Sequence, residues 1–166
     1  LSGKTVSIIS SGDPGVYGMA GLVLEMIAHE NRDLPIEIIS GIPAANAAAA
    51  VLGAPLMHDY AVISLSDLLT PWEVIEKRVR CAAEADYVIV LYNPKSSQRD
   101  WQIEKTAHII LQHKRPSTPV GIVKGVSRDD ESVLITTLDK MTSCAIDMTT
   151  VIIVGNATTF QFRDYM

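Results

Sequence analysis

The turn at residues 11–18 holds the densest group of residues that could do chemistry. Its glycines follow the spacing GxxGxxG, which differs from the GxGxxG of a dinucleotide-binding turn, and no P-loop lysine follows them. Glycines in such a turn let a ligand approach the backbone at the start of a helix. Asp13 is the candidate acceptor for a ligand amine or for ribose hydroxyls, and the alternative is that Asp13 caps the helix that follows.

A second candidate site is the polar turn at residues 92–99, which follows a strongly apolar segment. Its cations Lys95 and Arg99, like Arg128 in a later loop, carry ammonium or guanidinium groups that bind carboxylates. The alternative is an exposed turn without a binding role. Because the net charge is −5, an anionic partner must be held by such local basic loops and not by the field of the whole protein.

Composition and spacing argue against several other classes of function. The 14 Lys+Arg are fewer than the 19 Asp+Glu and are not clustered, so no nucleic-acid partner is expected. No apolar run reaches the ~18 residues of a membrane span, so no membrane partner is expected either. The histidines are scattered, and His108 and His113 miss the i,i+4 spacing of a helical metal pair, so no metal site is predicted.

Apolar runs alternate with helical patterns along the chain. They predict strands at residues 5–10, 35–39, 60–65, 86–92, 118–124, 132–138 and 151–154, and helices at residues 17–30, 44–52, 71–84 and 100–114. This alternation is typical of an α/β protein with mainly parallel sheets, in which ligands bind beyond the carboxyl ends of the strands.

Two features refine this expected architecture. The connection at residues 126–131 is too short for a parallel crossover, so the strands on either side should form an antiparallel hairpin, and the second half should contain a mixed sheet. Residues 54–59 look like a linker, which divides the chain into subdomains at residues 1–58 and 59–166. Thr70 is the expected N-cap of the helix that begins at Pro71.

Four motifs together resemble a known family. They are SSGDPGVYGMAG at residues 10–21, SGIPAANAAAAVLGAPLMHDYAVISLSDLLTPW at 40–72, LYNPKSSQRDW at 91–101 and TTVIIVGNATTF at 149–160. In this order they resemble the tetrapyrrole methyltransferases of cobalamin biosynthesis, and the second and third motifs resemble most the branch that methylates C17 of precorrin-3B or of cobalt-precorrin-3.

This resemblance implies two α/β subdomains of the tetrapyrrole methylase fold, with S-adenosylmethionine in the cleft between them and usually a homodimer. The opening strand and Gly-Pro-Gly type loop of the family have no counterpart before Lys4, so we expect an N-terminally truncated fragment whose first subdomain is incomplete. Two isolated cysteines without a disulfide framework fit the cytoplasm.

The family's contacts carry over to positions of this chain as implied site residues. Those implied to contact S-adenosylmethionine are Ser11, Gly12, Asp13, Val16, Pro43, Ala44, Tyr92, Asn93, Gly125 and Thr158. Pro43 replaces the hydroxyl residue often found there, so only a backbone contact would remain. The macrocycle is a polyanion, which makes Lys95, Arg99 and Arg128 the candidate substrate-binding residues.

The implied reaction is methyl transfer from S-adenosylmethionine to C17 of the tetrapyrrole, coupled to ring contraction. Such a transfer needs mainly alignment and desolvation. An acid or base would assist the rearrangement, and the candidates are Asp67, His58 and Tyr92. The alternative function is a truncated, non-catalytic binding or scaffold module of the same fold.

Overall fold

A computed structural model describes residues 3–96 and 99–166 of the chain. These residues divide into two compact units, of which the first ends at Ala44 and the second spans Ala45–Met166. None of the helices in the described ranges has the combined length and apolar character that a bilayer crossing requires.

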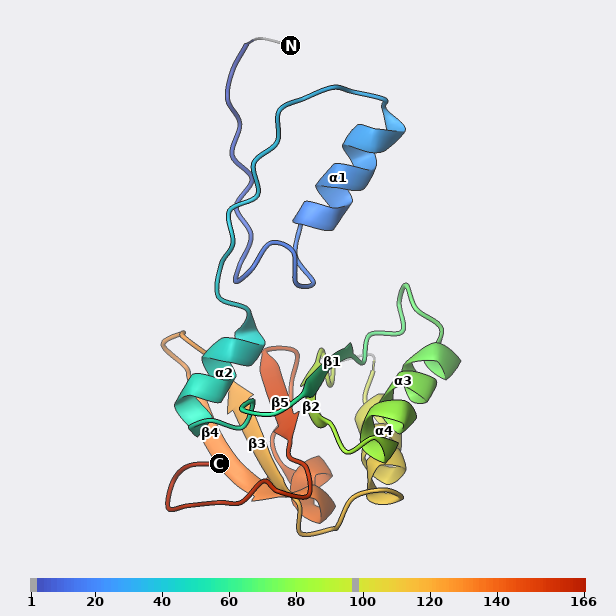
Figure 1. The fold of residues 1–166 in the computed structure, drawn as a ribbon, viewed down its shortest axis with the longest axis vertical. Helices are drawn as coiled ribbons and strands as arrows, with labels where there is room; N and C mark the ends of the chain where they lie inside the picture. Colours follow the sequence, from blue (N-terminus) through green and yellow to red (C-terminus); the bar gives the residue numbers. More distant parts are fainter. Residues whose placement is uncertain (1–2, 97–98) are drawn as a thin grey trace. The chain divides into compact units, whose positions relative to one another are not determined.

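The first unit contains α1 (Ala20–His29), drawn in blue in Figure 1, between two loop segments. The strands predicted at residues 5–10 and 35–39 are wrong, because both segments are neither helix nor strand. Their apolar side chains are exposed, with Val6 at 81% and Ile9 at 92%. β-Branched residues favour a strand, but a strand also needs a hydrogen-bonded neighbour, and neither segment pairs with one in the described part of the chain.

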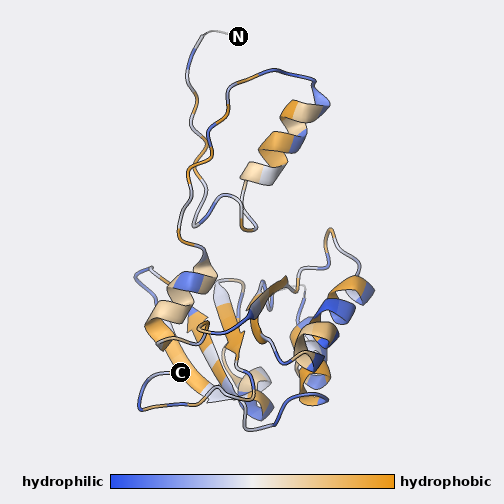
Figure 2. Cartoon of the chain, viewed as in Figure 1, coloured by the Kyte–Doolittle hydropathy of each residue, from blue (hydrophilic) through white to orange (hydrophobic). Residues whose placement is uncertain are grey.

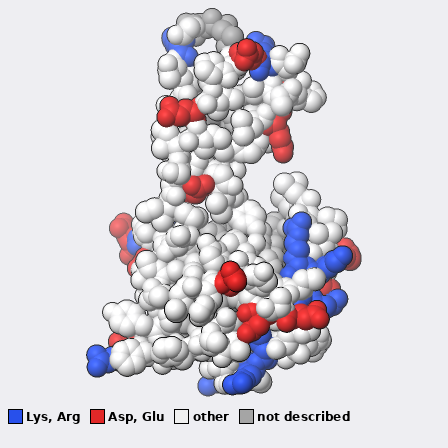
Figure 3. Space-filling model, in the orientation of Figure 1, with Lys and Arg blue, Asp and Glu red and all other residues white. Residues whose placement is uncertain are grey.

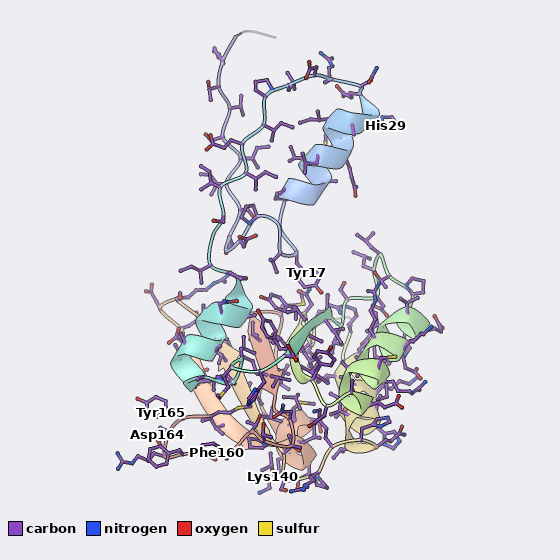
Figure 4. All side chains as sticks on the ribbon, in the orientation of Figure 1. Tyr17, His29, Lys140, Phe160, Asp164 and Tyr165 are labelled. Atoms are coloured by element: carbon purple, nitrogen blue, oxygen red, sulfur yellow. The ribbon has the colours of Figure 1, made fainter. Side chains whose placement is uncertain are left out.

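The helix α1 begins at Ala20, three residues later than predicted. Tyr17, labelled in Figure 4, has a φ of 52°, which is incompatible with a right-handed helix. The N–H of Ala20 donates instead to the carbonyl oxygen of Pro14 at 2.9 Å. The N-cap is Met19, which makes no side-chain capping bond, so Asp13 is not the cap of this helix.

The second unit is built on a five-stranded sheet with the order β1-β2-β5-β3-β4, shown in Figure 1. The strands are β1 (Tyr60–Ser64), β2 (Val88–Tyr92), β3 (Pro119–Lys124), β4 (Ser132–Thr137) and β5 (Thr150–Val154). The helices are α2 (Ala44–Leu52), α3 (Trp72–Glu84), α4 (Trp101–Leu111) and the 3-10 helix η1 (Leu138–Ser143). Each strand and α-helix overlaps a predicted element. The N-cap of α3 is Pro71 and not the predicted Thr70.

The sheet is mixed, as predicted for the second half of the chain. β3 and β4 pair antiparallel, with Lys124 opposite Ser132, which confirms the predicted hairpin. The expectation of a mainly parallel sheet is wrong, because among the described strands only β1 and β2 pair in parallel. η1 and the segment after it carry the chain back along the sheet, so that β5 enters between β2 and β3 and runs antiparallel to both.

Alternate side chains of the buried strands supply an apolar layer to each face of the sheet. Ile89 and Leu91 of β2 and Ile152 of β5 belong to the larger core, together with Ile75 of α3 and Ile110 of α4. Figure 2 shows the central strands mainly in the hydrophobic colour. The residues between them on each strand point to the opposite face.

That opposite face packs against α2 through a contact that requires glycine. Leu52 is fully buried, and a Cβ on Gly121 of β3 would overlap its Cδ1 and lie 2.7 Å from its Cδ2. Because Gly121 has no side chain, the helix can lie close to the strand. The predicted subdomain boundary after residue 58 falls inside the second unit, since α2 packs on this sheet. The division of the whole protein into subdomains at residues 1–58 and 59–166 stays a prediction.

We expect Gly121→Ala to destabilise the protein by about 1–3 kcal/mol, because the new methyl group overpacks Leu52. Leu52→Ala alone should cost about 2–5 kcal/mol through the cavity that it leaves. The double variant should cost clearly less than the sum, since the methyl group fills part of the cavity. Urea unfolding of the four proteins measures this coupling.

Leu138→Ala provides the matched background, because Leu138 is equally buried but belongs to the core on the other face. In the Leu138→Ala background, the free-energy cost of Gly121→Ala should add to the cost of Leu138→Ala. Additive costs in both backgrounds would contradict the contact between α2 and β3.

Candidate functional site

The register of the sheet brings the ends of β1, β2 and β3 and the starts of β4 and β5 to the same edge. Ser64 at the end of β1 pairs with Tyr92 at the end of β2. Lys124 at the end of β3 pairs with Thr150 at the start of β5. We call this the carboxyl edge, because β1, β2 and β3 all end there. Ligands of open α/β sheets bind beyond such ends.

A side-chain hydrogen bond joins the loops that follow β1 and β2. Nδ2 of Asn93 donates to Oγ of Ser64 at 2.9 Å, and the same oxygen accepts the N–H of Ser66 at 3.2 Å. Asn93 has a φ of 50°, a left-handed conformation that asparagine tolerates better than most residues. The side chain of Asn93 therefore bridges the two strands.

Arg99, predicted to bind a substrate carboxylate, has partners within the fold. Its Nη1 donates to the carbonyl oxygens of Leu65 at 3.0 Å and of Asn93 at 3.3 Å, and its Nη2 lies 3.4 Å from Sδ of Met148. A guanidinium presents its N–H donors in a fixed fork, and here that fork braces the two strand-end loops. A substrate carboxylate would have to compete with these contacts.

Asp67, a candidate catalytic residue, lies on the loop after β1 and is half-buried. Its Oδ2 accepts a hydrogen bond from Nε2 of Gln102 on α4 at 2.9 Å. Gln102 is only 1% exposed. Sequence reasoning missed Gln102, for which the available signal was a polar residue on a helix face that is otherwise apolar apart from Thr106.

Tyr92, a candidate for both catalysis and cofactor binding, anchors the start of α2. Its hydroxyl oxygen accepts the N–H of Ala45 at 2.7 Å, and Ala45 is 2% exposed. The first N–H groups of a helix have no acceptor within the helix, so the hydroxyl satisfies one of them.

Gly125, a predicted cofactor contact, lies at the carboxyl edge directly after β3. It has a φ of 57°, and a Cβ there would lie 2.7 Å from Oδ1 of Asp130. Its N–H donates to the carbonyl oxygen of Thr149 at 3.1 Å. Both the conformation and the available space therefore favour glycine.

An ion pair closes the carboxyl edge between β3 and β5. Nζ of Lys124 lies 2.9 Å from Oδ2 of Asp147, while Oδ1 accepts the N–H of Thr149 at 2.9 Å and its hydroxyl at 2.8 Å. The Lys124 hydrogen bond holds the pKa of Asp147 well below its usual range. In turn, the hydrogen bond and the charge of Asp147 raise the pKa of Lys124.

Two predicted site residues lie at the opposite edge of the sheet. His58 precedes β1 and Thr158 follows β5, and together with Asp86 they line a pocket of about 410 Å³. The structure therefore does not bring His58 and Thr158 together with Asn93 and Gly125. A parallel β5, as the sequence predicts, would place Thr158 at the carboxyl edge, whereas β5 is antiparallel and so ends at the other edge.

The opposite edge is held by an ion pair in which only the lysine is buried. Nζ of Lys114, whose side chain is 2% exposed, lies 2.8 Å from Oδ1 of Asp86, and the N–H of Ala157 donates to Oδ2 at 3.1 Å. Burial raises the pKa of Asp86, but the hydrogen bonds from Lys114 and Ala157 outweigh it and leave the pKa lowered. The carboxylate of Asp86 in the pocket therefore has a structural role, since it binds Lys114 and Ala157.

Within the first unit, Asp13 organises the glycine-rich turn. Its Oδ2 accepts the N–H of Gly41 at 2.9 Å and its Oδ1 that of Gly15 at 2.8 Å. These hydrogen bonds, first the one from Gly41, lower the pKa of Asp13. The carboxylate thus joins two loops that lie far apart in the sequence.

The same two loops touch through their backbones. A Cβ on Gly41 would overlap the carbonyl oxygen of Gly12, and a Cβ on Gly12 would lie 4.0 Å from Cα of Pro43. The structure therefore gathers the predicted cofactor contacts of this unit along one pair of loops. These contacts are Ser11, Gly12, Asp13, Val16 and Pro43 in the loops, together with Ala44, the first residue of α2.

The other predicted substrate-binding cations, Lys95 and Arg128, are exposed on the loops after β2 and β3. Figure 3 shows basic and acidic side chains interspersed on the visible face of the second unit. Any attraction for an anion must therefore come from individual loops at close range.

The C-terminal segment forms a second, mainly apolar pocket of about 310 Å³. Phe160 and Tyr165, labelled in Figure 4, line it together with Met57. The N–H of Met166 donates to the carbonyl oxygen of Leu52 at 2.7 Å, which ties this segment to the end of α2.

A family model described as tetrapyrrole (corrin/porphyrin) methylases matches residues 1–142 of the chain. The chain belongs to this family. The resemblance of the motifs and the predicted α/β fold class are thereby confirmed. The crystal structure of the methyltransferase CobJ has the same fold, with a TM-score of 0.91 and 36% identity, over 98% of this chain and 69% of that one.

Two methylase relatives are similar along nearly the whole chain. A cobalt-factor III methyltransferase of Priestia megaterium is 51% identical, and a probable cobalt-factor III C(17)-methyltransferase of Salmonella typhimurium is 50% identical. The matches cover 99% and 96% of this chain, but only 31% and 66% of the two relatives. The chain therefore spans less than two thirds of their lengths.

We expect Asp147→Asn to lower stability at neutral pH, and the difference from the unchanged protein to shrink as the pH falls. Lys124 lowers the pKa of Asp147 in the folded state, so the charged carboxylate stabilises the fold above the unfolded value of about 3.9. This contribution is lost as the pH falls through the lower folded value. Urea unfolding at a series of pH values measures both proteins.

Asp129→Asn is the control, because Asp129 is exposed on the nearby hairpin loop. The difference in stability between Asp129→Asn and the unchanged protein should not shrink in this way as the pH falls. A gap between Asp147→Asn and the unchanged protein that stays constant with pH would refute the role of this ion pair.

Proposed function

We propose that the protein transfers a methyl group from S-adenosylmethionine to C17 of a precorrin-3B or cobalt-precorrin-3 macrocycle, with ring contraction. The observation that carries this proposal is the 50% identity, over 96% of the chain, to a relative named as a probable cobalt-factor III C(17)-methyltransferase. The motifs at residues 40–72 and 91–101 favour the same branch of the family.

The turn around Asp13 has the chemistry that this cofactor needs. S-Adenosylmethionine supplies a methyl group bonded to a positively charged sulfur. Backbone N–H donors lower the pKa of Asp13, so it offers a carboxylate to an amine or to ribose hydroxyls. Gly12, with a φ of 72° and no side chain, leaves the backbone open to close approach.

In the second unit, Asn93 and Gly125 support the proposed cofactor contacts, since both lie in turns at the carboxyl edge with left-handed backbone conformations. Turns of this kind expose backbone groups to a ligand. Thr158 is left out of the proposed site because it follows β5 at the opposite edge.

Lys95 and Arg128 are the proposed partners of the substrate carboxylates. Both are exposed on loops of the carboxyl edge, and hydrogen bonds to charged groups contribute about 1.5–3 kcal/mol each. Arg99 contributes in another way, because its guanidinium holds the loops after β1 and β2 in place.

Alignment is the main contribution that we assign to the residues of the chain. Two-substrate transfers gain several kcal/mol when the reacting atoms are held in the right geometry. The hydrogen bonds of Arg99 and Asn93 fix the loops of the carboxyl edge before any ligand is bound. A fixed edge loses little conformational entropy on binding.

The family resemblance also supports a homodimer in the cytoplasm, which we include in the proposal. Sedimentation equilibrium measures the mass of the assembly, and the mass of a single chain at working concentrations would contradict the dimer.

The proposed reaction is tested by incubating the whole encoded protein with S-adenosylmethionine and either macrocycle. Mass spectrometry should show the gain of one methyl group, and carbon NMR should place it at C17. A folded protein that binds the cofactor and leaves both macrocycles unmethylated would contradict the proposal and would favour a non-catalytic module.

We expect Asp13→Asn to weaken the binding of S-adenosylhomocysteine by about 10–100-fold, the effect of losing one charge-assisted hydrogen bond. Titration calorimetry on the whole protein measures the affinity. Asp33→Asn, an exposed carboxylate of the same unit, is the control and should change nothing. Equal affinities for all three proteins would restrict Asp13 to joining the loops at Gly15 and Gly41.

A further inference from the structure

We propose that Asp67 accepts the N–H proton that the metal-free macrocycle releases after methylation, and that Gln102 is the residue that positions its carboxylate. This inference rests on the proposed methyl transfer and assigns the proton acceptor that the sequence alone left open among three candidates. It is carried by a hydrogen bond between a half-buried acid and a buried amide.

The contact occupies one side of the carboxylate. Nε2 of Gln102 donates to Oδ2 of Asp67 at 2.9 Å. Gln102 is 1% exposed on α4, so the donor is fixed by its packing. Oδ1 of Asp67 makes no hydrogen bond to the described residues, and this is the atom that can receive a proton.

Core stability does not explain a glutamine at this position. Oε1 of Gln102 is buried and has no hydrogen-bond partner among residues 3–96 and 99–166. Leaving a buried amide oxygen unpaired costs free energy that an aliphatic side chain of similar size would not incur. An ionised carboxylate accepts hydrogen bonds only, so the amide must turn Nε2 toward Asp67 and leave Oε1 unpaired. The unpaired oxygen therefore follows from the hydrogen bond that Gln102 gives to Asp67.

The backbone that carries Asp67 is also fixed. Leu65 is fully buried, its N–H donates to the carbonyl oxygen of Tyr92 at 2.9 Å, and its carbonyl oxygen accepts from Arg99 at 3.0 Å. The loop therefore cannot shift freely between β1 and Asp67. Polar groups held in place in this way need little reorganisation during a reaction.

The other two candidates are less suited to take the proton. The hydroxyl oxygen of Tyr92 already accepts the N–H of Ala45 at the start of α2. His58 lies at the edge of the sheet opposite to the loop of Asp67. Of the three candidates, only Asp67 both lies at the carboxyl edge and has an acceptor atom without a partner in the described structure.

The residues next to Asp67 suit the face of a tetrapyrrole macrocycle. Leu68 and Leu69 are 83% and 94% exposed, so two aliphatic side chains directly follow the carboxylate on the same loop. Covering them with the face of a tetrapyrrole would remove apolar surface from water on binding. It would also exclude water from the vicinity of Asp67.

In the proposed step, methyl transfer to the metal-free macrocycle is followed by loss of an N–H proton. A ring carbon conjugated with a pyrrole N–H uses its electron pair to form the new bond to the methyl group, and the sulfur keeps the electrons of the bond that breaks. The conjugated ring is left with one positive charge. The N–H proton then passes to Oδ1 of Asp67, the electrons of the N–H bond neutralise the ring, and the carboxylate becomes a carboxylic acid.

The test is a double-variant cycle on the whole encoded protein, with kcat and KM for the macrocycle as readouts. Asp67→Asn should lower kcat by about 10²–10⁴-fold, the usual contribution of a positioned base. Gln102→Leu, which removes the donor, should lower kcat by about 10–100-fold with little change in KM, because the carboxylate is misplaced. In the Asp67→Asn background, Gln102→Leu should have almost no further effect on kcat.

Thr106→Val is the matched control. Thr106 lies one helical turn further along α4, is 0% exposed, and its hydroxyl has no partner among the described residues. This change disturbs the same buried helix face without touching Asp67, so kcat should stay close to that of the unchanged protein. Gln102→Glu keeps the size of the side chain but replaces the donor by an acceptor, so it should reproduce the kcat defect of Gln102→Leu even if the latter fails to fold.

Asp59→Asn provides the control for Asp67, because Asp59 lies on the loop before β1 at the opposite edge. It should leave kcat unchanged. If Gln102→Leu or Gln102→Glu lowers kcat equally with and without Asp67, or if Asp67→Asn leaves kcat unchanged, the inference is overturned. The proposed function fails differently, namely when the unchanged protein transfers no methyl group.

Discussion

The arrangement of the second unit depends on the burial of β5 on both of its faces. All five residues of this strand are buried, and it pairs with β2 on one side and β3 on the other. A strand buried on both faces must be covered by other elements. α3 and α4 cover one face and α2 the other, where Gly121 admits Leu52. Because β5 is antiparallel to both neighbours, its start joins the ends of β1, β2 and β3 at the carboxyl edge.

The polar side chains at the carboxyl edge have a structural role in the fold itself. Arg99 bonds to the carbonyl oxygens of both strand-end loops, Asn93 bonds to Ser64, and Tyr92 anchors α2. Strand ends leave backbone groups without ladder partners, and the two Arg99 bonds satisfy the carbonyl oxygens of Leu65 and Asn93. The same bonds fix the positions of the loops that carry the proposed site. Fold and site at this edge are therefore one hydrogen-bonded network, and a substitution in it acts on both.

Local patterns predicted the second unit well, because its strands and helices have clear apolar periodicity and short connections. The strands expected at residues 5–10 and 35–39 failed, since propensity does not supply the neighbouring strand that pairing needs. The direction of β5 was also missed, which placed Thr158 at the wrong edge. Leu65, one partner of Arg99, lies 34 positions away in the sequence, and Asp67, the partner of Gln102, lies 35 positions away. No local pattern reveals bonds across such separations.

The two edges of the sheet differ in how completely their polar groups are satisfied. At the opposite edge, Asp86 accepts hydrogen bonds from Lys114 and Ala157 through both oxygens. The buried charge of Lys114 is therefore paired, and both carboxylate oxygens have partners. At the carboxyl edge, Gln102 gives one hydrogen bond to Asp67 and keeps a buried oxygen unpaired. Unpaired buried groups lower stability, and proteins retain them mainly where function requires them. The opposite edge is therefore built for stability, while the carboxyl edge gives up some stability to hold a carboxylate whose Oδ1 has no partner among the described residues.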